Sequence, residues 1–183
     1  MSRNKHVVLG VTGSIAAYKA CEIIRALQRQ GIDVSVVMTT EAKQFVTPLT
    51  FASLSRNRVY GDMFVKDWAD WDIEHVSLAE RADLLLIAPA TANVIGKIAQ
   101  GLADDLLSCL AMTTKAPIII APAMNTGMYI NKIVQENIKK LQAHGFHIIS
   151  PVKGLLACGT VGDGHLADIE TIVKKVCALL KNK

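Results

Sequence analysis

The chain of 183 residues predicts an α/β fold, with a single domain over residues 1–183 built on a doubly wound parallel sheet. Apolar runs typical of strands alternate with stretches of helical periodicity from one end of the sequence to the other. The runs are unbroken, as expected for parallel strands buried on both faces. Hydrophobic residues make up 51% of the chain and the mean hydropathy is +0.31, which is sufficient for a sizeable core. The β-α-β-α order predicts right-handed crossovers between parallel strands.

The individual elements follow from start and stop signals. His6–Gly10 is predicted as the first strand, and the helix after it, from about Ser14 to Gln30, is ended by Gly31. The other strands are expected at 34–38, 84–88, 117–121 and 146–149, and the other helices at about 39–54, from His75, at 91–100, 104–113 and 131–143, and from Asp168. Two long connections remain, 56–74 and 150–167. A connection as long as the first is usually functional or part of an assembly.

Two of the predicted strands run directly into a proline, which is expected to end the sheet ladder. Small and amide-bearing residues follow, because the sequence reads Pro89-Ala90-Thr91-Ala92-Asn93 after one strand and Pro122-Ala123-Met124-Asn125 after the other. Ligands in open α/β sheets bind at the carboxyl ends of strands. The two strand ends therefore predict one shared ligand crevice.

The turn after the first strand, Gly10–Ala17, is a candidate cofactor site. Its glycines allow close backbone approach, and the following helix start offers free N–H groups. The spacing is not G-x-G-x-x-G, and the second strand ends at Thr39 without the acid that a dinucleotide ribose requires. Hydroxyls at that position suit a terminal phosphate, which favours FMN over NAD. A glycine turn that only closes a βα unit stays open as the alternative.

Three further side chains allow both a structural and a functional interpretation. Asn93 and Asn125 are either helix caps or hydrogen-bond donors to a ligand, and Met124 and Met128 beside Asn125 indicate apolar pocket walls. His75 lies near a predicted helix start, where the helix dipole favours a neutral imidazole that can accept a proton. A lone histidine is nevertheless more often structural.

Charge and cysteine content exclude several classes of function. The 20 basic and 16 acidic residues give a net charge of +4 without a basic stripe, so no nucleic-acid partner is expected. The apolar runs are too short to span a bilayer, so we expect a cytoplasmic protein without a membrane partner. The cysteines lack C-x-x-C spacing, which predicts no metal site. Cys21, Cys109 and Cys177 are expected to be small core residues, whereas Cys158 lies in a glycine-rich loop.

Four segments together resemble one family. Pro89–Asn93 is similar to its Pro-Ala-Ser-Ala-Asn motif, and Pro122–Met128 matches its Pro-x-Met-Asn-x-x-Met motif. His75 stands at the position of its active-site histidine, and Ala157-Cys158-Gly159 matches its substrate-clamp loop. Along its whole length the chain therefore resembles the flavin-containing cysteine decarboxylases, and within them the bacterial phosphopantothenoylcysteine decarboxylases.

This resemblance implies a Rossmann-like or flavodoxin-like flavoprotein that binds FMN. The implied activity is a carboxy-lyase that converts 4′-phospho-N-pantothenoylcysteine to 4′-phosphopantetheine in coenzyme A biosynthesis. Flavin oxidises the substrate thiol, carbon dioxide leaves, and the enethiol is then reduced. The resemblance also implies a homotrimer or a dodecamer of trimers. A separate phosphopantothenate–cysteine ligase is expected, because no synthetase domain follows Lys183.

The same resemblance assigns roles to single residues. His75 resembles the catalytic base, which acts across a subunit boundary in this family, and Cys158 resembles the proton donor of the final reduction. Asn125, together with Met124 and Ala123 of its motif, resembles the residue that holds the substrate carboxylate. The flavin contacts that the resemblance implies are Gly13, Ser14, Thr39, Ala92 and Asn93.

The chain departs from the family pattern at a few positions. Thr91, Val94 and Tyr129 are mild replacements within the motifs, whereas Thr160 and His165 replace an aspartate and an arginine of the clamp. The missing arginine leaves open how the clamp closes on an anionic substrate. Alternative functions are a peptidyl-cysteine decarboxylase, which would lack the clamp cysteine, a flavin prenyltransferase, a flavodoxin-like electron carrier and a non-enzymatic regulatory subunit.

Overall fold

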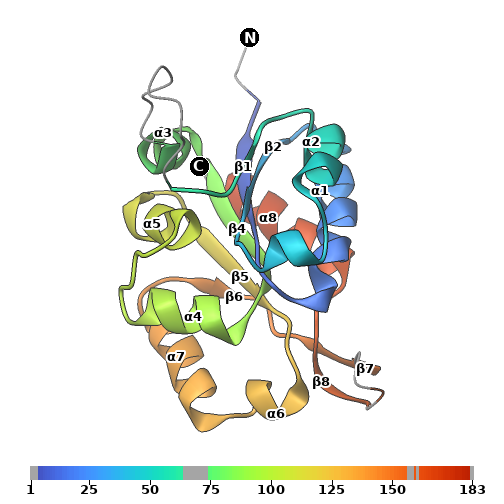
Figure 1. The fold of residues 1–183 in the computed structure, drawn as a ribbon, viewed down its shortest axis with the longest axis vertical. Helices are drawn as coiled ribbons and strands as arrows, with labels where there is room; N and C mark the ends of the chain where they lie inside the picture. The colour runs from blue at the N-terminus through green and yellow to red at the C-terminus, as the bar shows by residue number, and fades with distance from the viewer. Residues whose placement is uncertain (1–3, 64–73, 156–158, 160, 182–183) are drawn as a thin grey trace.

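The computed structural model describes residues 4–63, 74–155, 159 and 161–181. Six parallel strands form one sheet in the order β3-β2-β1-β4-β5-β6 (Figure 1). The strands of this sheet are β1 (His6–Val11), β2 (Asp33–Met38), β3 (Val59–Tyr60), β4 (Leu84–Ala90), β5 (Ile118–Pro122) and β6 (His147–Ile148). From β1 the chain adds β2 and β3 on one side and then β4, β5 and β6 on the other, so the strand order reverses between β1 and β4. Doubly wound sheets bind their ligands at this point. The predicted fold class is confirmed.

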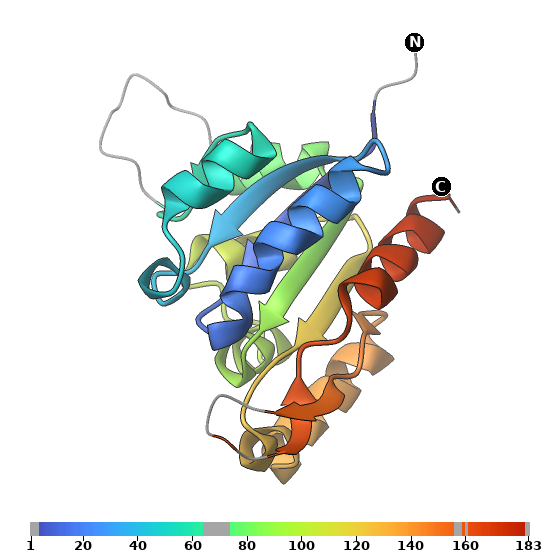
Figure 2. The same ribbon diagram turned by 90° about the vertical axis from the view of Figure 1, so that its right-hand side faces the viewer.

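Helices cover both faces of the sheet. One face is covered by η1 (Ile15–Lys19), α1 (Ala20–Gln28), α2 (Pro48–Ser55) and α8 (Ile169–Lys181). The other is covered by α3 (Glu74–Arg81), α4 (Ala92–Ala99), α5 (Leu106–Thr113) and α7 (Lys132–Ala143). Figure 2 shows α1 and α8 side by side in front of the strands. Two cores result, because successive strand residues point to opposite faces: Leu9 of β1 lies in the first core and Val8 in the second. None of the helices in the described ranges is long and apolar enough to cross a membrane.

The first two predicted helices are each interrupted. The helix expected from Ser14 begins as the 3-10 segment η1, with Ser14 as its N-cap, and becomes α-helical only at Ala20. The stretch expected as one helix over 39–54 is divided into η2 (Ala42–Gln44) and α2. Pro48 is the reason for the second break, because it starts α2 and keeps the residue before it in an extended conformation.

Two other expectations about the chain are wrong. Pro89 does not end its strand: β4 continues to Ala90, with a cis peptide bond at Ala88–Pro89 and a register shift against β5 between Ile87 and Ala90. The connection 150–167 is not a plain loop, because β7 (Val152–Leu155) and β8 (Val161–His165) form an antiparallel hairpin. We call this hairpin the clamp hairpin. The clamp hairpin contacts the short helix α6 (Thr126–Tyr129) through β8. The sequence pattern did not predict α6 as an element.

The long connection 56–74 contributes β3 to the edge of the sheet, and its residues 64–73 lie outside the described part of the chain. Cys21, Cys109 and Cys177 are half-buried and not fully buried core residues as expected, although Cys21 and Cys177 pack against the first core. Burial raises the pKa of the Cys21 thiol. Burial also raises the pKa of Cys109, and the nearby carboxylates of Asp105 and Asp104 add to that shift.

Candidate active site

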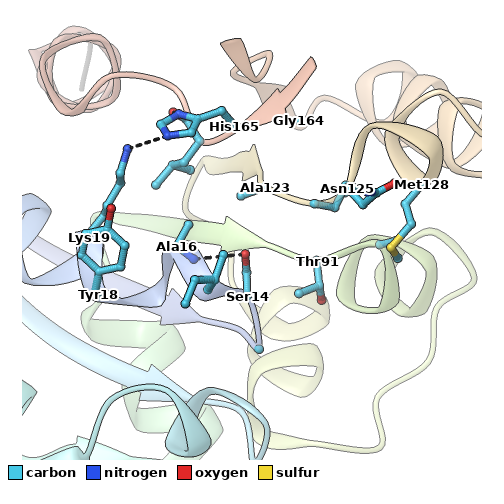
Figure 3. A pocket seen from close by; sticks show the side chains of 15 residues that line it. Ser14, Ala16, Tyr18, Lys19, Thr91, Ala123, Asn125, Met128, Gly164 and His165 are labelled. Carbon is cyan, nitrogen blue, oxygen red and sulfur yellow. Dashed lines mark hydrogen bonds between the residues drawn. The ribbon is translucent and has the colours of Figure 1, made fainter. Parts of the chain in front are cut away.

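A cavity of about 620 Å³ opens at the carboxyl ends of β1, β4 and β5 (Figure 3). Most of its surface is apolar, and its walls come from the first turn, the start of α4, the segment around α6 and the clamp hairpin. The lining residues are Gly13, Ser14, Ile15, Ala16, Tyr18, Lys19, Thr91, Ala92, Ala123, Met124, Asn125, Met128, Gly164, His165 and Leu166. The two strand ends thus share one cavity, as the sequence predicted.

Thr12 connects the first turn to the end of β4. Its side chain is buried, and Oγ1 donates a hydrogen bond to the carbonyl of Pro89 at 2.7 Å. The same oxygen accepts a hydrogen bond from the backbone N–H of Thr91 at 3.0 Å. One hydroxyl therefore fixes the relative position of two walls of the cavity.

The glycine turn is held tightly against the end of β2. A Cβ atom at Gly13 would lie 2.4 Å from Cβ of Glu41, so only glycine fits there. Ser14 caps η1, with its Oγ accepting a hydrogen bond from Ala16 N at 3.3 Å. Thr39 precedes Glu41 in the neighbouring segment and accepts from Ala42 N. Gly13 and Ser14 line the cavity, whereas Thr39 is not among the lining residues and its backbone N–H donates to the carbonyl of Val11 at the end of β1.

At the start of α4 the helix cap is Thr91 and not Asn93. The Thr91 hydroxyl accepts a hydrogen bond from Val94 N at 3.4 Å. Thr91 and Ala92 line the cavity. Asn93 lies in the first turn of the helix, is exposed and does not belong to the lining.

The loop after β5 is fixed by backbone hydrogen bonds on two sides. Ala123 N donates to the carbonyl of Ala90 and Met124 N donates to that of Gly164, each at 3.0 Å. Asn125 caps α6, with its Oδ1 accepting from Gly127 N at 2.8 Å. Because the amide oxygen is engaged in this way, the cap fixes the orientation of the Asn125 side chain beside the cavity.

The clamp hairpin contributes its base to the cavity. Gly164 has φ of +132°, and a Cβ atom there would lie 2.2 Å from the carbonyl oxygen of Met124. His165, the next residue, has its Nε2 3.2 Å from Nζ of Lys19. Figure 3 shows this pair closing the cavity on the side away from Asn125 and Met128.

The two predicted catalytic residues lie at the limits of what the structure describes. Cys158 is outside the described residues, between the two strands of the clamp hairpin. The backbone of His75 is described in the first turn of α3. Figures 1 and 2 both show α3 and the clamp hairpin at opposite ends of the molecule. One copy of the chain therefore does not bring these two segments together.

Several residues at or beside the cavity carry no individual prediction from the sequence. Thr12 is buried beside the wall rather than part of it, although a hydroxyl within a run of small residues is a usable signal. Lys19 and Tyr18 look like ordinary helix residues, and only the fold places them at the cavity. His165 departs from the clamp pattern and Gly164 matches it, but the pattern does not indicate that either residue lines the cavity.

Comparison with known proteins gives a consistent result. A family model described as "Flavoprotein" matches residues 1–181. A Bacillus subtilis protein named coenzyme A biosynthesis bifunctional protein CoaBC is 49% identical over 174 residues, which are 95% of this chain and 43% of that protein. A Streptococcus mutans protein named as a probable phosphopantothenoylcysteine decarboxylase is 46% identical over 94% of this chain and 97% of its own length. The chain thus spans less than half of the bifunctional relative and nearly all of the other.

Solved structures agree with these relatives. A PPC decarboxylase variant complexed with pantothenoylaminoethenethiol has a TM-score of 0.87 and 31% identity, covering 98% of this chain and all of the other. The FMN-binding protein AtHal3 has a TM-score of 0.84 and 32% identity, over 99% of both chains. With a family model over almost its full length and relatives well above 30% identity, the chain belongs to the flavoprotein family.

Proposed function

We propose that the protein is an FMN-dependent phosphopantothenoylcysteine decarboxylase, which forms 4′-phosphopantetheine for coenzyme A biosynthesis. The observation that carries this proposal is the shared cavity, which unites the glycine turn, the Asn125 loop and the base of the clamp hairpin. The names of relatives at 46% and 49% identity support the same activity.

The residues of the cavity fit a flavin. Ala16, Ala92 and Ala123 present small apolar side chains, which suit a flat ring system. Gly13 and Ser14 form a tight turn whose backbone can approach a phosphate, since a Cβ atom at Gly13 has no room. Thr39 is bonded through its backbone N–H to Val11, the last residue of β1 before this turn. When bound, the flavin would take two electrons from the substrate thiol and return them after decarboxylation.

Asn125 would bind the carboxylate that is lost. An amide N–H donor suits a group that can only accept hydrogen bonds. Because Gly127 N donates a hydrogen bond to Oδ1 of Asn125, the amide oxygen can be told apart from the amide nitrogen. Met124 and Met128 beside it provide apolar surroundings, in which a carboxylate gains less from solvent and leaves more readily as carbon dioxide.

His75 and Cys158 would move the protons. The imidazole of His75 would take the proton of the substrate thiol, and the Cys158 thiol would supply a proton during the final reduction. Because α3 and the clamp hairpin lie at opposite ends of one copy, we assign His75 to the cavity of a neighbouring copy.

Exposed apolar side chains support such an assembly. Ile15 and Tyr18 at the cavity mouth are 56% and 53% exposed, and Val161 on β8 is 66% exposed. Ile15 and Tyr18 line the same cavity, and exposed apolar side chains that lie together are typical of an interaction surface. We propose a homotrimer or a dodecamer of trimers, as the family resemblance implies, with each cavity completed by the partner subunit.

The test is incubation of the FMN-loaded protein with 4′-phospho-N-pantothenoylcysteine, followed by mass spectrometry for loss of carbon dioxide. His75→Asn should keep its flavin and release no carbon dioxide. Cys158→Ser should accumulate the enethiol instead of phosphopantetheine. A colourless protein that takes up no flavin on titration would contradict the whole proposal. Normal phosphopantetheine formation by Cys158→Ser would contradict the role of that residue.

A further inference from the structure

Lys19 and His165 form a defined pair at one end of the cavity. His165 Nδ1 lies 3.0 Å from the carbonyl of Leu166, and Nε2 lies 3.2 Å from Nζ of Lys19. Since a carbonyl oxygen only accepts, Nδ1 carries the proton and Nε2 presents its lone pair to the ammonium group. In this arrangement the imidazole accepts the hydrogen bond, and the Lys19 ammonium group is the donor.

That charge faces the cavity without an acidic partner in its wall. Among the described lining residues Lys19 is the single charged side chain, and none of them is an aspartate or glutamate. The walls around it are mostly apolar, and a charge in such surroundings interacts more strongly with an opposite charge than it would in water. An anionic group of a ligand would find its counter-charge here.

The position of the histidine is fixed by its backbone. The ring packs over Gly154 of β7, where a Cβ atom would lie 3.2 Å from Cγ of the imidazole. The residue before it, Gly164, has no room for a side chain against Met124. The clamp hairpin thus holds the imidazole in place, and the imidazole in turn orients the lysine.

We propose that Lys19, positioned by His165, binds the phosphate of the substrate and makes the enzyme select phosphorylated cysteine derivatives. The inference rests on the proposed function. In Figure 3 the Lys19–His165 pair lies across the cavity from Asn125, so a substrate with its carboxylate at Asn125 can place a second anion at Lys19. A peptide ending in cysteine has no phosphate for this position. The pair therefore distinguishes the two cysteine-decarboxylating activities.

The first experiment compares phosphorylated and unphosphorylated pantothenoylcysteine as substrates. The ratio of their kcat/KM values should exceed about tenfold in the unmodified protein and fall by about tenfold or more in Lys19→Gln, mainly through KM. Lys139→Gln is the matched control, because it removes the same charge from an exposed position on α7 outside the cavity. The control should keep the ratio of the unmodified protein.

The positioning role of His165 is tested by two replacements. His165→Leu removes the acceptor for the lysine and should lower the same ratio. His165→Gln provides a side-chain oxygen as a new acceptor and should restore part of the preference. Equal losses for both substrates in both variants would indicate a purely structural role and would overturn the inference.

Equilibrium binding supplies a readout that is independent of turnover. Calorimetric titration should show that 4′-phosphopantetheine binds more tightly than pantetheine, and that added salt or Lys19→Gln removes the difference. The FMN content of Lys19→Gln must stay at the level of the unmodified protein. Loss of FMN with an unchanged preference would mean that the lysine binds the phosphate of the cofactor, which overturns the inference. Absence of carbon dioxide release from either substrate would instead overturn the proposed function, and the titration would still decide the role of Lys19.

Discussion

At the scale of single residues, Thr12 shows how much of the site depends on one buried hydroxyl. Thr12→Val keeps the shape but leaves the Pro89 carbonyl and the Thr91 N–H without their partner. We expect a loss of about 1 to 3 kcal/mol in the free energy of unfolding, measured by urea denaturation, together with weaker flavin retention. Thr12→Ser keeps the hydroxyl and should lose distinctly less. Equal losses in the two variants would mean that the methyl group, and not the hydrogen bonds, matters.

Residue-scale prediction from sequence succeeds where a motif is local. The segments 89–93 and 122–128 could be placed at one cavity because each follows a buried strand directly. The roles of Thr12 and Lys19 could not be predicted, since their partners are 77 and 146 positions away in the chain. Asn93 is a residue whose side chain predicts more than the structure shows. Asparagine is suited to a helix cap or a ligand contact, but Thr91 caps the helix and Asn93 is exposed.

At the scale of elements, a lysine joins α4 to the start of α5. Lys97 Nζ lies 2.8 Å from Asp104 and 2.7 Å from Asp105, and these bonds raise the pKa of Lys97 to about 12. Burial alone would raise the pKa of Asp105, but hydrogen bonds from Lys97 and Ser108 outweigh it and lower that pKa below 3.8. Asp105 also forms a capping box with Ser108 at the start of α5.

The pH dependence of this connection follows from the two shifts. Lys97→Met should lose about 1 kcal/mol of unfolding free energy near neutral pH. The lowered pKa of Asp105 stabilises the fold above pH 3.8, and this contribution is lost as the pH falls through the pKa of Asp105 in the folded protein. The raised pKa of Lys97 stabilises the fold below pH 10.5, and this contribution is lost as the pH rises towards 12. The difference between variant and unmodified protein should therefore shrink below about pH 4 and above about pH 10.5.

The control for this prediction is Lys174→Met on α8. Lys174 forms an exposed pair with Glu170, four residues earlier, and both side chains are more than 70% exposed. An exposed pair of this kind contributes little. Its removal should leave the unfolding free energy almost unchanged, without the same pH profile.

The clamp hairpin depends on a glycine that no other residue can replace. Gly164→Ala would require both an unfavourable backbone conformation and a Cβ atom 2.2 Å from the Met124 carbonyl. We expect a destabilisation of about 2 to 4 kcal/mol in chemical denaturation. Gly101→Ala is the matched control, because Gly101 also has positive φ, at +72°, but open space around it, and should lose about 1 to 2 kcal/mol. Similar losses of unfolding free energy at Gly164 and Gly101 would show that the close approach to the Met124 carbonyl adds nothing to the destabilisation.

The elements that the sequence predicts well are those that are buried on both faces. The long apolar strands β1, β2, β4 and β5 were placed to within one or two residues because both faces are buried. The hairpin β7–β8 could not be predicted because its described residues are mostly exposed or half-buried, and its sequence, rich in glycine and charge, has no clear alternation. The two-residue strand β3 at the sheet edge is too short to leave a pattern.

At the scale of the whole molecule, the fold class and the position of the cavity could both be predicted. Alternation of element types determines a doubly wound sheet, and such a sheet places its ligand at the reversal of strand order. The assembly could not be derived in this way, because an exposed apolar residue such as Tyr18 gives no signal in a sequence. It becomes visible only when the fold places it at the cavity mouth.

The proposed trimer gives a direct prediction for the mass in solution. Light scattering after gel filtration should give about 59 kDa, three times the chain mass of 19.8 kDa, or a multiple of that value. Tyr18→Asp places a charge at the cavity mouth and should shift the mass towards 19.8 kDa. Tyr18→Phe should leave the assembly intact. A monomeric unmodified protein that nevertheless decarboxylates its substrate would contradict the shared cavity.

The half-buried cysteines have a consequence for the handling of thiols. Substrate and product of the proposed reaction both carry a free thiol, so any reactive cysteine of the protein could be captured in a mixed disulfide. Only the thiolate attacks, and the raised pKa values of Cys21 and Cys109 keep both residues protonated at neutral pH. The Cys109 Sγ also donates a hydrogen bond to the carbonyl of Ala103. These two cysteines should therefore react with thiol metabolites and their disulfides more slowly than an exposed cysteine of ordinary pKa.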